Sequence, residues 1–139
     1  MSAEIDSSLK KASELLTQGL YQEGSDELIK IFSIEPNHRE ALCLLAETMH
    51  RLGQSESALA LLSDAMKAGD VDAAILARMA EILESLGRMD EAADFYMFAA
   101  EQAPDDAGVL KKAAEALEFV GRHEDLKGLR EWLASRPCE

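Results

Sequence analysis

Four glycines recur at an interval of 34 residues along this chain, at Gly19, Gly53, Gly87 and Gly121. Each stands in a similar setting, as in MHRLGQSESA, ILESLGRMDEA and LEFVGRHEDL. A fixed period of this length indicates one structural unit that is repeated along the chain and stacked on its neighbours. Such arrays expose long shaped surfaces and rarely enclose a catalytic pocket, so the period favours binding over catalysis.

Each repeat has the pattern of two amphipathic helices on either side of its glycine. Apolar residues such as Leu45 and Met49 precede the glycine at helical spacing. The glycine itself suits a helix end that needs a left-handed backbone, and Pro36 and Pro104 stop the helices that follow. We therefore expect eight helices, near residues 4–18, 21–34, 39–52, 55–68, 73–86, 89–102, 107–120 and 123–134.

Small residues stand at equivalent places in the repeats. An alanine lies seven residues before each glycine, at Ala12, Ala46, Ala80 and Ala114. Because small side chains let neighbouring helices approach closely, these alanines predict the contact surfaces between helices.

Composition limits the class of protein further. The chain has 139 residues, of which 47% are apolar and only 5% aromatic, and its formal net charge is −13. This charge repels nucleic acid and anionic membranes and attracts a basic partner, although acidity alone also keeps a small protein dispersed. No apolar run is long enough to span a bilayer, no secretory signal is evident, and Cys43 and Cys138 form no CxxC pair. These features predict a cytoplasmic protein.

With its alanines, glycines and the helix-ending prolines, the whole chain resembles the tetratricopeptide repeat family. The resemblance implies a single all-α domain over 1–139, a right-handed α-solenoid of four helical hairpins with repeats near 5–38, 39–72, 73–106 and 107–139. The fourth repeat departs from the pattern, because Leu126 replaces a small residue and Arg130 an apolar one. Either its last helix is shifted by one residue, or it serves as a differently shaped capping helix.

The resemblance also implies a function: a protein–protein interaction module, an adaptor or chaperone that holds a partner peptide or helix in a concave groove, without a cofactor. One chaperone-binding subtype grips a partner's terminal carboxylate with lysine, arginine and asparagine. At the matching places this chain has Leu9, Ser13, Leu44, Ala74 and Arg78, so only the arginine agrees. A bacterial secretion-system chaperone is an alternative that size and charge alone suggest.

The groove would be lined by one face of each first helix. Helical spacing places these residues on that face: Asp6, Leu9, Lys10, Ser13, Leu16, Thr17; Glu40, Cys43, Leu44, Glu47, His50, Arg51; Ala74, Ala77, Arg78, Glu81, Glu84, Ser85; Gly108, Lys111, Lys112, Glu115, Glu118 and Phe119.

Charges on this face recur at the repeat period. Acids form one row and bases a second row three residues earlier: Glu47, Glu81 and Glu115 with Glu84 and Glu118 alongside, and Lys10, Arg78 and Lys112. One interpretation is a solvated face whose acids pair with bases on their own helix. The other is a groove whose acids bind lysine or arginine side chains of a partner while its leucines, Leu9, Leu16 and Leu44, receive apolar ones.

A second candidate interface lies on the opposite side of the last two repeats. Phe98 and Trp132 occupy equivalent positions on second helices, and Phe95 and Leu129 lie one turn away. An apolar patch here suits self-association into a structural homo-oligomer. Alternatively, Trp132 covers the exposed end of the stack.

Motifs for catalysis or metal binding are missing from the sequence. His38, His50 and His123 fall in three different repeats, and no HxxxH, CxxC or HExxH spacing occurs. No glycine-rich phosphate loop and no GxSxG motif is present. We therefore expect neither a metal site nor enzyme activity.

Overall fold

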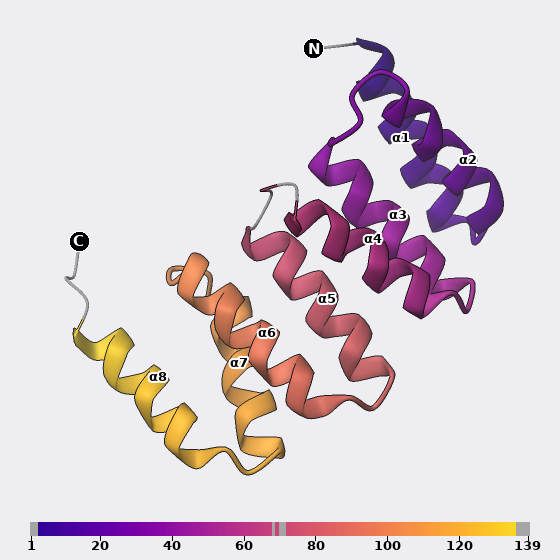
Figure 1. Cartoon of the computed structure of the whole chain (residues 1–139). Coiled ribbons are helices and arrows are strands. Elements are labelled where there is room, and N and C mark those ends of the chain that lie inside the picture. Colours follow the sequence, from indigo (N-terminus) through magenta and orange to yellow (C-terminus); the bar gives the residue numbers. More distant parts are fainter. Residues whose placement is uncertain (1–2, 68, 70–71, 136–139) are drawn as a thin grey trace. The chain divides into compact units, whose positions relative to one another are not determined.

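The computed structural model describes residues 3–67, 69 and 72–135, and these residues form eight α-helices and no strand. The helices follow one another along the chain, joined by short connections (Figure 1). Their bounds are α1 Ala3–Thr17, α2 Tyr21–Phe32, α3 Arg39–Arg51, α4 Ser55–Lys67, α5 Ala73–Ser85, α6 Met89–Gln102, α7 Ala107–Phe119 and α8 His123–Ser135.

The predicted all-α class and the eight helices are confirmed, and each boundary lies within two residues of the expected one. The second helices start at Tyr21, Ser55, Met89 and His123, which are successive steps of 34 residues. The last helix therefore begins at the same point of its repeat as its predecessors. Within it, Leu129 is buried and Arg130 is exposed, although Arg130 is the equivalent of the buried Tyr96. Both alternatives for the fourth repeat, a shifted helix and a capping helix, stay predictions.

The four periodic glycines end the first helix of each hairpin in the same way. Their φ angles lie between 77° and 85°, in the left-handed region where a side chain would be strained. In the second repeat, Gly53 N–H donates to the His50 carbonyl and Gln54 N–H to the Met49 carbonyl, at 3.0 and 2.8 Å. Both bonds recur at the other three glycines. This pair of bonds is the Schellman motif, and it turns the chain directly into the second helix.

In the second, third and fourth hairpins, the first helix also begins in an equivalent way, which the sequence pattern did not predict. His38, Asp72 and Asp106 cap α3, α5 and α7, each by accepting a backbone N–H bond from inside the first turn. The Asp72 carboxylate, for example, accepts from Ile75 N–H at 2.9 Å. A cap of this kind satisfies an N–H group that the helix leaves without a partner.

The chain divides into two compact units, Met1–Val71 and Asp72–Glu139, each of which holds two hairpins. One continuous array over all four repeats stays a prediction. In the first unit, α2 packs against both α1 and α3. Its core contains Ile5 and Ala12 of α1, Leu28 and Ile31 of α2, and Ala41 and Leu45 of α3.

In the second unit, α6 packs against both α5 and α7, and four of the five buried residues of α6 are alanines. Ala80, Ala92, Ala93, Ala99 and Ala100 are completely buried. Their small side chains allow the close helix approach that the repeat pattern predicts.

An arginine ties the last helix of the second unit to α6. Arg122 donates hydrogen bonds to Asp125 and to Asp94, each at 2.7 Å, and to the Asp90 carbonyl at 3.3 Å. The bonds to Asp94 and Asp125 raise the pKa of the guanidinium. The start of α8 is therefore held by ion pairs as well as by apolar packing.

In the first unit, Glu27 of α2 lies between two lysines. It accepts a hydrogen bond from Lys30 at 2.7 Å and lies 3.6 Å from Lys11 of α1. The Lys30 hydrogen bond is the main cause of a lowered pKa of the Glu27 carboxyl, against the desolvation that raises it, and Lys11 lowers it further.

Stability should consequently depend on the protonation of Glu27. A carboxyl whose folded pKa lies below its ordinary value of 4.5 stabilises the protein fully above that pH. This contribution is lost as the pH falls through the folded pKa. We expect Glu27→Gln to lower the free energy of unfolding by about 0.5–1 kcal/mol at pH 7. Urea unfolding at neutral and at strongly acidic pH measures the effect, and a difference from wild type that fails to shrink in acid would contradict it.

Candidate functional site

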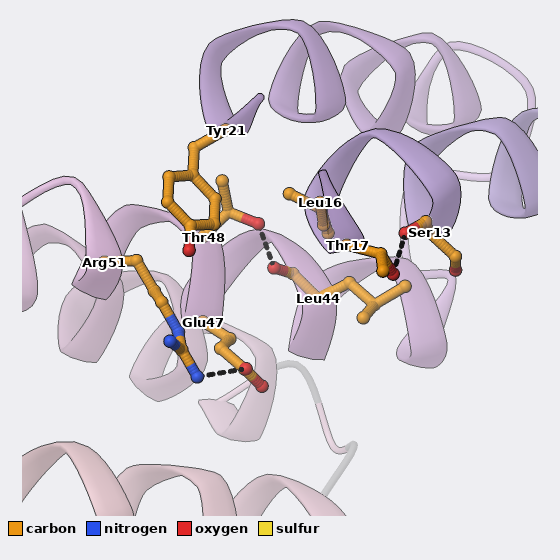
Figure 2. Close-up of a pocket in the computed structure, with 8 residues that line it drawn as sticks. All are labelled: Ser13, Leu16, Thr17, Tyr21, Leu44, Glu47, Thr48 and Arg51. Carbon is orange, nitrogen blue, oxygen red and sulfur yellow. Dashed lines mark hydrogen bonds and ion pairs between the residues drawn. The ribbon is translucent and has the colours of Figure 1, made fainter. Parts of the chain in front are cut away.

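A pocket of about 440 Å³ opens between α1, the start of α2, and α3 in the first unit (Figure 2). Its volume lies in the range of ligand and side-chain pockets in proteins. Its lining residues are Ser13, Leu16, Thr17, Tyr21, Leu44, Glu47, Thr48 and Arg51.

The apolar part of the pocket is built by Leu16, Leu44 and Tyr21. Leu16 and Leu44 are half-buried and pack against the core of the unit, so their positions are fixed from beneath. Tyr21 stands at the first residue of α2, where the glycine-containing turn brings the chain back beside α1. The three side chains together form the apolar wall of the pocket.

The polar groups of the pocket are largely satisfied within it. The Thr17 and Thr48 hydroxyls donate to the carbonyls of Ser13 and Leu44, at 2.8 and 2.7 Å. Arg51 donates to Glu47 at 3.4 Å, and this pair lies at the same end of the pocket as Tyr21 (Figure 2). The Arg51 and Glu47 charges that line the pocket are therefore paired with each other.

Six of the eight lining residues belong to the face that the sequence predicted, and helical spacing alone was sufficient to find them. Tyr21 and Thr48 were missed. Tyr21 lies on a second helix, outside the set considered, and Thr48 is buried at the edge of the predicted face of α3. The exposed Thr17 and half-buried Leu44 come from different helices, so the fold brings two predicted faces to one pocket.

The predicted face of α5 lines a second pocket, of about 400 Å³, in the second unit. Arg78 donates to Glu81 across 3.2 Å inside it, as expected for a base and an acid three residues apart. The sequence did not predict that Asp106, the residue that caps α7, and Val109 would join this pocket. The remaining lining residues are Ala73, Ala74 and Ala77.

One acid of the predicted face binds the hydroxyl of Tyr96 in the second unit, and two others act on it through their charge. Tyr96 is buried on α6, and its hydroxyl donates to Glu84 Oε1 of α5 at 3.0 Å. Burial raises the pKa of the phenol most, and the Glu84 hydrogen bond and the charges of Glu84, Glu81 and Glu115 raise it further. Glu115 of α7 and the two acids of α5 therefore act on the same point.

The acids of α7 differ from those of α5 in their pairing. Lys112 and Glu115 are three residues apart, yet neither forms an ion pair within the described part of the chain, and the same is true of Glu118. All three side chains are exposed. The self-paired interpretation is therefore confirmed for Arg78 with Glu81 but not for α7.

The other predicted residues take varied positions. Leu9 packs against the core of the first unit, and Lys10 is exposed. In the candidate outer interface, Phe95 and Phe98 form an edge-to-face pair with centroids 6.1 Å apart. Phe98 and Trp132 are exposed by 47% and 38%, but Leu129 is buried together with Leu126 of the same helix. Leu129 thus adds no exposed apolar surface, contrary to expectation.

Among the described residues, no group of three or more histidine, cysteine or acidic side chains has the geometry to hold a metal ion. The helices of the same residues are also too short and too polar for any of them to cross a membrane.

Three solved structures that resemble this fold are distant in sequence. The first tetratricopeptide domain of human RPAP3 matches with a TM-score of 0.73 and 17% identity, covering 87% of this chain and 95% of that one. A MamA structure labelled AMB-1 matches with a TM-score of 0.64 and 23% identity, covering 94% of this chain and 71% of that one. A chain of a Naa15/Naa10 complex bound to HypK-THB matches with a TM-score of 0.78 and 18% identity, covering 96% of this chain and 20% of that one.

No curated protein matches the chain in sequence. A family model described as "Psidin, N-terminal TPR repeats region" matches residues 8–126. That match covers most of the chain and includes all four periodic glycines and the residues of the pocket described above. The chain belongs to the tetratricopeptide repeat family.

Proposed function

We propose that this protein is a non-enzymatic interaction module, an adaptor or chaperone that holds a segment of a partner protein against the faces of its first helices. The observation that carries the proposal is the pocket of about 440 Å³ in the first unit. Its apolar wall of Leu16, Leu44 and Tyr21 fits one apolar side chain of the partner.

The charges of the second unit favour a partner segment that is basic as well as apolar. Glu84, Glu115 and Glu118 have no cation paired with them in the described residues, and the whole chain carries a net charge of −13. Lysine or arginine side chains of a partner would complement these acids and speed its association at low salt.

Relatives of this fold support the binding of peptides or proteins in general. Another solved structure of similar fold is the first tetratricopeptide domain of Spaghetti (RPAP3) bound to the HSP90 peptide SRMEEVD, with a TM-score of 0.72 and 17% identity. That peptide carries three acidic residues near its end, whereas the acids described here would repel it. We therefore propose a different, basic class of partner for this chain.

A displayed library of random 12-residue peptides tests the proposal. Selection against the immobilised protein should enrich peptides that combine a large apolar residue with lysine or arginine. Thr17→Trp should weaken their binding at least about tenfold, because the new indole fills the pocket from an exposed position. Added salt should weaken binding as well, because the charges involved are exposed.

A matched control keeps this experiment specific. Ile29→Trp places the same indole on an exposed position of α2 that does not line the pocket, and it should leave affinity unchanged. Equal losses for the two variants would show that the pocket is not the binding site. Enrichment of acidic peptides, or of none, would overturn the proposal as a whole.

A further inference from the structure

The most exposed large apolar side chain in the described part of the chain is Phe119, at the last residue of α7. Its exposed fraction is 73%. The equivalent positions of the other repeats hold Thr17, Arg51 and Ser85, which are polar and also exposed. The fold therefore places this position in solvent in every repeat and does not require an aromatic residue there. An exposed aromatic ring that the core does not use is a feature of binding surfaces.

Carboxylates accompany this ring on the same face of α7. Glu115 lies one helical turn before Phe119, so the two side chains are neighbours on the helix surface. Glu118 precedes Phe119 directly in the sequence. Both acids are exposed, and neither has an ion-pair partner among the described residues. The nearby bases on this face are Lys111 and Lys112, and both leave Glu115 unpaired although their spacing would allow a pair.

The combination of a free ring and a free carboxylate fits one side chain better than any other. A guanidinium group can stack flat on an aromatic ring while its N–H groups bind a carboxylate in a forked arrangement. An ammonium group is more strongly hydrated and cannot make both contacts with one planar surface. Cation–π contacts in proteins accordingly involve arginine more often than lysine.

We propose that α7 selects an arginine side chain of the partner, with the ring of Phe119 as its stacking surface and Glu115 as its counter-ion. This inference rests on the proposed function and makes it more specific, since the acids alone would accept lysine and arginine equally. Phe119 determines specificity here, and Glu115 contributes affinity for either cation. The alternative is that a second copy of the chain covers this face and contacts Phe119.

Two fluorescein-labelled peptides, measured by fluorescence anisotropy with the full chain, test the inference. Both are alanine- and glutamine-based, and they differ only in carrying either three arginines or three lysines at four-residue spacing. The wild-type protein should bind the arginine peptide about two- to fivefold more tightly. Phe119→Leu, which keeps an apolar side chain but removes the π face, should abolish this preference. Glu115→Gln should weaken both peptides and keep their ratio.

Ile29→Ala is the control, because Ile29 is an exposed apolar residue on α2, outside this face. It should change neither affinity. Two results would overturn the arginine assignment: equal binding of the two peptides by wild type, or a preference for arginine that survives Phe119→Leu. The proposed function still stands in either case, provided that Glu115→Gln weakens the binding of both peptides. Failure of both peptides to bind overturns the arginine assignment alone, because neither peptide carries a large apolar residue for the pocket of the first unit. A sedimentation coefficient that falls with Phe119→Leu, with unchanged peptide binding, assigns the face to a second copy instead.

Discussion

Leu28→Ala should lower the free energy of unfolding by about 2–5 kcal/mol. Leu28 lies on α2 at the centre of the first unit's core, has no exposed surface, and packs with residues of α1, α2 and α3. Its truncation removes apolar contacts with all three helices and leaves a cavity that rigid helices close only in part. Urea unfolding monitored by circular dichroism measures the change.

The adjacent residue provides the control for this prediction. Ile29 is 55% exposed on the same helix, and Ile29→Ala changes a side chain of the same size and composition. We expect its effect to stay within about 0.5 kcal/mol, as for most surface substitutions. Similar losses for both variants would mean that α2 does not present Leu28 to the core.

Ala80→Leu should lower the free energy of unfolding by about 1–3 kcal/mol through overpacking. Ala80 is completely buried on α5, at the place where each repeat carries an alanine seven residues before its glycine. The larger side chain can be accommodated only if α5 and its neighbour move apart. Ala46, buried equally well on α3 of the first unit, should respond to the same change in the same direction. Thermal and urea unfolding give the magnitude.

Ala74→Leu on the same helix separates overpacking from a general effect of leucine. Ala74 is exposed, so the substitution there has no buried neighbour to displace and should be close to neutral. An unchanged midpoint for Ala80→Leu would contradict the helix register that the 34-residue period predicts.

The features that the sequence predicted well are those that local chemistry determines. A glycine at positive φ is needed wherever a helix ends in a Schellman motif, so Gly53 and its equivalents mark four turns directly. The apolar spacing that precedes each glycine then gives the helices to within two residues. For the same reason, the faces of α1 and α3 could be assigned, and six of the eight residues that line the pocket in the first unit were found.

The features that the sequence predicted poorly depend on contacts between helices. Spacing on one helix shows that Lys112 and Glu115 can meet, but not that they remain apart. Leu129 was expected on an outer surface because its position was compared with Phe95, whereas the packing of α8 buries it. Tyr96 carried a usable signal that was overlooked. It occupies the position of Leu28 and Leu62, so its hydroxyl enters a core and needs an acceptor from a neighbouring helix.

The hydrogen bond from Tyr96 to Glu84 has a consequence for recognition. It engages one carboxylate oxygen, Oε1, and thereby restricts the torsions of a side chain that would otherwise rotate freely in water. The second oxygen keeps its lone pairs for an incoming donor. A partner that binds there meets an acceptor already held in one orientation and loses less entropy on forming the contact. A buried phenol can in this way contribute to affinity without ever touching the ligand.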